Sequence, residues 1–127
     1  PRVNTIDYIS IPVLGNASDF GDRTVSTNGQ GGTSDGSRGV FGGGYATAAE
    51  DTIDYINIAT IGNAVDFGNR TVSLQGLPAT SDGSRGVFVG GDPSDVIDYI
   101  TISTVGNALD FGDLTAAMGY MAAFSGD

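Results

Sequence analysis

The stretch "TIDYINIATIGNAVDFGNRTVS" (52–73) decides the fold, because the chain contains three similar copies of it. The other copies read "TIDYISIPVLGNASDFGDRTVS" from Thr5 and "VIDYITISTVGNALDFGDLTAA" from Val96, so the copies begin 47 and then 44 residues apart. A fixed period of this length is typical of repeat proteins, in which each unit buries its apolar face against its neighbours. We expect one repeat domain over 1–127, with units at 4–50, 51–94 and 95–127.

A second phrase is also duplicated. "SDGSRGVFGGG" begins at Ser34 and "SDGSRGVFVGG" at Ser81. A single active site needs one correctly placed set of groups, whereas stacked units need the same packing residues in every copy. The repeated letters therefore indicate a scaffold and not a catalytic loop.

Alternating β-branched and polar residues predict strands in every unit. In the middle copy we expect strands at 53–60, 63–68, 71–76 and 85–91, with "LPATSDGS" (77–84) as a surface loop. The first strand recurs at 97–104, and Gly-Asn pairs mark the corners. The chain has 21 glycines, which disfavour helices. The predicted fold class is all-β: antiparallel four-stranded sheets that form the blades of a β-propeller.

The pattern resembles kelch-type propeller repeats, in which a double glycine, a tyrosine and an aromatic residue followed by arginine recur. The matching residues here are Gly42–Gly43, Gly90–Gly91, Tyr8, Tyr55, Tyr99, Phe20, Phe67, Phe111, Arg23 and Arg70. Two departures are the lack of tryptophan and Leu114 in place of a third arginine. The phrases also resemble kelch-like repeats in structural proteins of marine bacteriophages of the cyanophage type. That resemblance implies a virion or extracellular location.

The order of strands predicts about two full blades and part of a third. The chain begins with the last two strands of a blade and is expected to end with a first strand at 115–123. A closed propeller needs about four to eight blades. The ring is therefore completed either by the remainder of a longer chain or by other copies joined head to tail, with a six-bladed dimer favoured.

Composition excludes several classes of function. The net charge is −10, which argues against nucleic acid and anionic membranes as partners. There is no apolar run of about 18 residues that would predict a membrane span. The chain has no Cys, His or Lys, so serine triads, thiolate metal sites and copper-radical chemistry lack their residues. We expect no enzyme activity, no catalytic residues, no metal and no cofactor.

Other local motifs have structural explanations. The "DFG" triplets lack the companion motifs of kinases, so we expect Phe in a core and Gly at a corner. Asp35 and Asp82 are too isolated for a calcium loop and are expected to form turns. Arg38 and Arg85 are expected to pair with carboxylates or to bond between blades, with ligand binding as the minority alternative.

Three functions stay open from the sequence. The first is a non-enzymatic structural or adhesive propeller of a phage virion or tail. The second is a carbohydrate-binding propeller with a cell-surface glycan as ligand, and the third is a glycoside hydrolase that uses a pair of carboxylates. Any binding face is expected where the repeats diverge, in loops 44–51 and 92–95. The candidate ligand-binding residues are Tyr45, Thr47, Glu50, Asp51, Asp92, Ser94 and Asp95.

Overall fold

The computed structural model describes residues 2–126, and within them every regular element is a β-strand. The all-β prediction is confirmed. The ten strands are β1 (Val3–Tyr8), β2 (Ser18–Thr27), β3 (Gly31–Ser34), β4 (Arg38–Gly42), β5 (Thr52–Asn57), β6 (Val65–Asn69), β7 (Ala79–Ser81), β8 (Arg85–Gly91), β9 (Ser94–Thr101) and β10 (Leu109–Met118).

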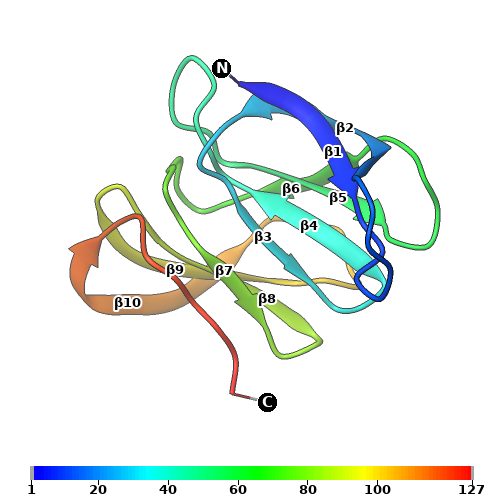
Figure 1. Cartoon of the computed structure of the whole chain (residues 1–127). Coiled ribbons are helices and arrows are strands. Elements are labelled where there is room, and N and C mark those ends of the chain that lie inside the picture. The colour runs from blue at the N-terminus through cyan, green and yellow to red at the C-terminus, as the bar shows by residue number, and fades with distance from the viewer. Residues whose placement is uncertain (1, 127) are drawn as a thin grey trace.

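The strands form three antiparallel sheets, and in the described residues none closes into a barrel. The first sheet is the pair β1–β2, the middle sheet has the order β3-β4-β5-β6, and the last has the order β7-β8-β9-β10. Each sheet is thus a meander in which chain neighbours pair. The middle sheet contacts both others, through β5 against β2 and through β3 against β7 (Figure 1).

The sheets do not coincide with the sequence units. The middle sheet takes β3 and β4 from the unit 4–50 and β5 and β6 from the unit 51–94. The last sheet is divided in nearly the same way between the second and third units. Adjacent units therefore share a sheet, which links them by a ladder of backbone hydrogen bonds as well as by packing.

Two expected strands are wrong. Residues 71–76 form no strand, because their backbone groups bond to loop residues far away in sequence: Leu74 N–H donates to Glu50 O, and Gly76 N–H donates to Gly29 O. The strand that precedes β8 is instead β7, inside the stretch 77–84 that was expected to be a loop. The separate strand expected at 115–123 is also absent, since residues 115–118 continue β10 and 119–126 carry no strand.

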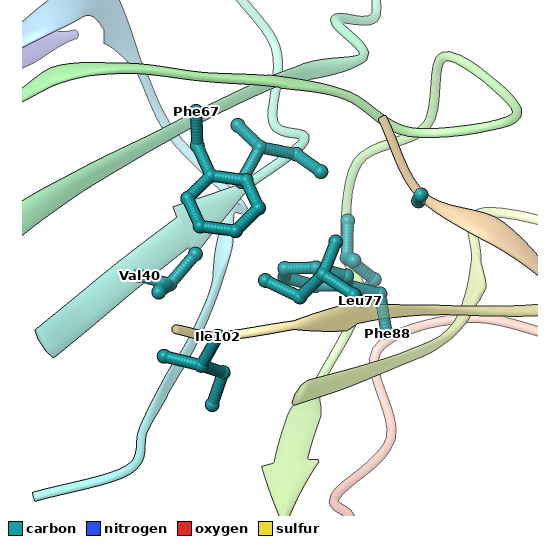
Figure 2. Close-up of a cluster of buried hydrophobic side chains, with 8 residues drawn as sticks. Val40, Phe67, Leu77, Phe88 and Ile102 are labelled. Carbon is teal, nitrogen blue, oxygen red and sulfur yellow. The ribbon is translucent and has the colours of Figure 1, made fainter. Parts of the chain in front are cut away.

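Two apolar cores lie between sheets. The larger one joins the middle and last sheets, and Figure 2 shows Val40 and Phe67 of the middle sheet gathered with Phe88 of the last sheet and with Ile102, which directly follows β9. The smaller core joins the first and middle sheets through Ile6, Phe20, Ile56 and Ala64. Because the cores lie between sheets, each sheet depends on its neighbours for burial. No helix in the described chain has the length and apolarity to cross a membrane.

Candidate functional site: the junctions between sheets

The junction between the middle and last sheets contains a fully buried ion pair. Arg70 Nη2 lies 2.8 Å from Asp98 Oδ1, and Arg70 Nε donates to the same oxygen at 3.0 Å. The other oxygen, Asp98 Oδ2, accepts from the backbone N–H and the hydroxyl of Thr71 at 2.9 and 3.0 Å. The guanidinium also lies over the Phe88 ring, 5.6 Å from its centre. Every oxygen of the carboxylate is therefore satisfied, as a buried charge requires.

The junction between the first and middle sheets repeats this arrangement. Arg23 Nε donates to Asp54 Oδ1 at 2.9 Å, and the backbone N–H of Thr24 donates to Asp54 Oδ2 at 2.8 Å. Arg23 lies over the Phe41 ring at 5.4 Å. Here Nη1 of the arginine also donates to Thr27 Oγ1 at 2.6 Å. The ion pairs of the two junctions are formed by residues at the same positions of the repeat.

In the junction of Arg70, between the middle and last sheets, the position that matches Thr27 is Leu74, whose side chain offers no oxygen. Arg70 Nη1 accordingly has no hydrogen-bond partner among the described residues. In the junction of Arg23 the nitrogen without a hydrogen-bond partner among the described residues is Nη2, which lies 2.9 Å from Asp54 Oδ1. The two junctions therefore share the ion pair and differ in which guanidinium nitrogen makes no hydrogen bond.

Backbone hydrogen bonds hold the same junctions at the "DFG" corners. Gly106 N–H donates to Phe67 O at 3.0 Å, and Ala108 N–H donates to Asn69 O at 2.9 Å. Asn69 N–H in turn donates to Asn107 Oδ1 at 3.0 Å. The corner residues 20–22 and the loop 62–64 make the same three bonds in the other junction.

Glycine is required at these corners. Gly68 has φ +149°, and a Cβ there would lie 2.4 Å from the backbone oxygen of Gly106. Gly21 has the same conformation and the same contact with Gly62. The "DFG" glycine thus permits both an unusual φ and a close approach of the next sheet.

Both ends of the described chain present half of such a junction. At the first sheet Asp7 corresponds to Asp54 and Asp98, but it is exposed, and within residues 2–126 its carboxylate has no hydrogen-bond or ion-pair partner. At the last sheet Phe111 is 53 % exposed, whereas the matching Phe67 is 1 % exposed. We call these surfaces the Asp7 face and the Phe111 face.

The expected loop residues lie at one end of the sheets, beside the segment 74–76. Gly44 N–H donates to Leu74 O, and Asp92 N–H donates to Gln75 O. Thr47, Asp92 and Asp95 are exposed, and Tyr45, Glu50, Asp51 and Ser94 are half-buried. None of the seven lines any of five prominent surface hollows of the described residues.

Tyr45 stacks on a neighbour within the chain. The Arg2 guanidinium lies over its ring, 4.9 Å from the ring centre. The backbone of Tyr45 exchanges hydrogen bonds with Asn28 at 2.8 and 3.2 Å, so this loop helps to join the first sheet to the middle one.

The two Asp-Gly turns have equal geometry. Asp35 Oδ1 accepts from the backbone N–H groups of Ser37 and Arg38 at 2.9 and 2.8 Å, and Asp82 makes the same bonds in the other copy. These donated hydrogen bonds, that from Arg38 or Arg85 first, hold the pKa of both carboxyl groups below their usual range. Within residues 2–126 no group of three or more acidic, His or Cys side chains is placed to hold a metal ion.

The tyrosines of the second and third units each lie between an arginine and a phenylalanine. Tyr55 meets Phe67 edge to face at 5.6 Å and carries Arg38 over its ring at 4.5 Å. Tyr99 is placed in the same way beneath Arg85, at 4.6 Å. Arg38 differs from Arg85 in that its Nη1 also donates to Ile102 O in the next sheet, at 2.9 Å.

This difference makes Arg38 and Arg85 a matched pair for mutation. Both lose a stacked guanidinium on replacement with alanine, but only Arg38→Ala also loses a hydrogen bond to the neighbouring sheet. We expect Arg38→Ala to lower the free energy of unfolding by about 1 kcal/mol more than Arg85→Ala does. Urea denaturation followed by circular dichroism measures both; equal losses would show that the bond to Ile102 contributes nothing.

Sequence reasoning missed the partners of Arg23 and Arg70. The signal was present: the "IDYI" phrase places an aspartate in the middle of an apolar strand in all three copies. A carboxylate that is buried at this position needs a cation, and the chain has only five cationic residues.

Comparison of the chain with protein-family models and with curated protein sequences finds no match in either.

Proposed function

We propose that the chain is a non-enzymatic structural and interaction module, in which the sheets are blades of a β-propeller of the kelch-like kind. The observation that carries this proposal is the junction itself, which the chain builds twice around the same Arg–Asp pair and presents half-built on the Asp7 and Phe111 faces. A surface that repeats an internal interface is suited to bind another blade.

The use of the charged residues supports a structural role. Two buried ion pairs, Arg23–Asp54 and Arg70–Asp98, occupy these four charged side chains. A glycoside hydrolase needs two carboxyl groups that face a substrate, and these two carboxylates face guanidinium groups. In both junctions the repeated arginine and aspartate therefore serve packing between sheets.

We infer that further blades complete the ring, from other copies of the chain or from a longer chain. The resemblance to phage structural proteins favours a virion or tail component in an extracellular setting, and a net charge of −10 favours solubility there. Carbohydrate binding through Tyr45 and its loop is the second candidate, because loop residues such as Thr47 are exposed.

Association through the end faces can be tested at Ala17. The matching residues Ala64 and Ala108 are buried in the two internal junctions, whereas Ala17 is exposed on the Asp7 face. We expect the wild type to self-associate weakly and Ala17→Glu to weaken that association at least tenfold, because the new carboxylate would be buried without a partner. Sedimentation equilibrium over a wide concentration range measures this.

Ala48→Glu is the matched control, since it adds the same charge at an exposed site in the loop 44–51. Equal association of the two variants, or a wild type that stays monomeric at millimolar concentration, would contradict assembly through the end faces. A glycan array tests the second candidate function. Binding of a glycan by the wild type that is abolished in Tyr45→Ala would favour carbohydrate binding instead.

A further inference from the structure

The first sheet has a free edge where the other sheets have a strand. In the middle sheet β4 pairs with β5, with Val40 opposite Tyr55 and Phe41 opposite Asp54, and in the last sheet β8 pairs with β9 in the same register. The strand that corresponds to β5 and β9 is β1, and within residues 2–126 its only partner is β2. The other edge of β1 therefore offers unpaired backbone groups.

A hollow of about 400 Å³ lies beside this edge. Its walls are largely apolar and come from both the first and the middle sheets. The residues that line it are Thr5, Ile6, Asp7, Tyr8, Ile9, Phe20, Arg23, Gln30, Phe41, Ile56 and Ile58. We call it the β1 groove. Its apolar surface is available to bury against an extended strand that pairs with the edge of β1.

Phe41 shows what should cover the groove. Its counterpart in the last sheet, Phe88, is 0 % exposed, because Gly42 of the middle sheet lies directly over the ring. A Cβ on Gly42 would come within 2.5 Å of the Phe88 ring. Phe41 is only half-buried. Phe41 occupies in the middle sheet the place that Phe88 occupies in the last sheet. The strand that covers Phe41 therefore needs glycine at the position that Gly42 has in β4.

Tyr8 gives a second, independent indication. Tyr55 and Tyr99 each carry an arginine from the neighbouring strand over the ring, at 4.5 and 4.6 Å. Tyr8 makes the same edge-to-face contact with Phe20 that Tyr55 makes with Phe67, but it is 42 % exposed. An arginine on the incoming strand would complete this stack.

We propose that the β1 groove binds an extended strand of the type Arg-Gly-Val-Phe-Gly-Gly, supplied by a further repeat and paired antiparallel to β1. The strand places its valine opposite Tyr8, its phenylalanine opposite Asp7 and its first following glycine opposite Ile6, as β4 does on β5. The inference rests on the proposed function, since it names the element with which the next repeat engages the Asp7 face.

The chain itself contains an acceptable and an unacceptable version of this strand. β4 has Gly42 at the decisive position, whereas β8 has Val89 there. A valine over Phe41 would overlap the ring. The groove therefore discriminates between the two repeated sequences by a single side chain, at a cost typical of overpacking.

The test uses two capped peptides and the full chain. One peptide has the sequence SRGVFGGG of residues 37–44, and the other carries Gly42→Val. Titration of ¹⁵N-labelled chain should shift the amide signals of residues 5–9 and Phe41, with the valine peptide binding at least tenfold more weakly. A third peptide with Arg38→Ala should also bind more weakly, because it cannot stack on Tyr8.

Equal binding of the glycine and valine peptides, no binding at millimolar concentration, or shifts confined to other strand edges would overturn the proposal. So would tighter binding of a peptide with the sequence of residues 119–126, which lacks the Arg-Gly-Val-Phe-Gly-Gly pattern. Peptide binding with no effect of Ala17→Glu on assembly would refute association of copies through the end faces and leave the β1 groove standing. If Ala17→Glu weakens assembly but the glycine peptide does not bind, the strand-binding groove alone is refuted.

Discussion

Replacement of Asp98 with alanine is expected to lower the free energy of unfolding by about 3–5 kcal/mol. Arg70, the partner of Asp98, is only 3 % exposed. In the variant its buried guanidinium would keep its charge without a counter-ion. Thr71 would also lose the acceptor of its N–H and hydroxyl groups. Urea denaturation followed by circular dichroism measures the loss, and hydrogen exchange shows whether the last sheet opens first.

Asp7→Ala is the matched control for this prediction. It removes the same residue of the repeat from an exposed site, and we expect a change within about 0.5 kcal/mol. The double variant Arg70→Leu with Asp98→Leu should lose less than the sum of the two single variants, because no buried charge is left unpaired. Additive losses, or an equal cost at Asp7 and Asp98, would show that the pair does not act as a unit.

Gly68→Ala is expected to be the second severe change. At φ +149° an alanine is strained, which costs about 1–3 kcal/mol. Its Cβ would also lie 2.4 Å from Gly106 O, a backbone atom held by the junction hydrogen bonds. We expect this contact to add about 1–3 kcal/mol, because the last sheet must shift away from the middle one.

Gly112→Ala isolates the contact from the strain. Gly112 has φ +148° and occupies the same place in the "DFG" triplet, but a Cβ there would meet nothing within 4 Å. Both variants carry the strain, so the difference between their free energies of unfolding reports the junction. If Gly112→Ala proves as costly as Gly68→Ala, the glycine serves backbone conformation alone.

The sequence predicted the local structure well where a few neighbouring residues decide it. The "SDGS" turns form as expected, since Asp35 and Asp82 bond to backbone groups only two and three residues ahead. The strands β5 and β9 lie where period-2 alternation predicted them, within a few residues. The all-β class follows from the same alternation.

The segment 71–76 shows where this reasoning failed. Its letters favour a strand, and in the first copy the matching residues 24–27 do belong to β2. In the middle copy the same backbone groups bond to Glu50 and Gly29 in other parts of the fold. A competing partner that lies far away in sequence overrode the local preference.

The sequence by itself determined the repeat, the alternation that makes strands and the turns between them, because each depends on contacts within a few residues. Only the tertiary structure decided which copies of a letter are buried: Phe67 is 1 % exposed and Phe111 is 53 % exposed, within the same "DFG" triplet. Burial and ion pairing need a neighbouring sheet, and the partners of Arg23 and Arg70 lie 31 and 28 residues away. The same repeated residues are therefore buried where a neighbouring sheet packs against them and exposed where no described sheet does.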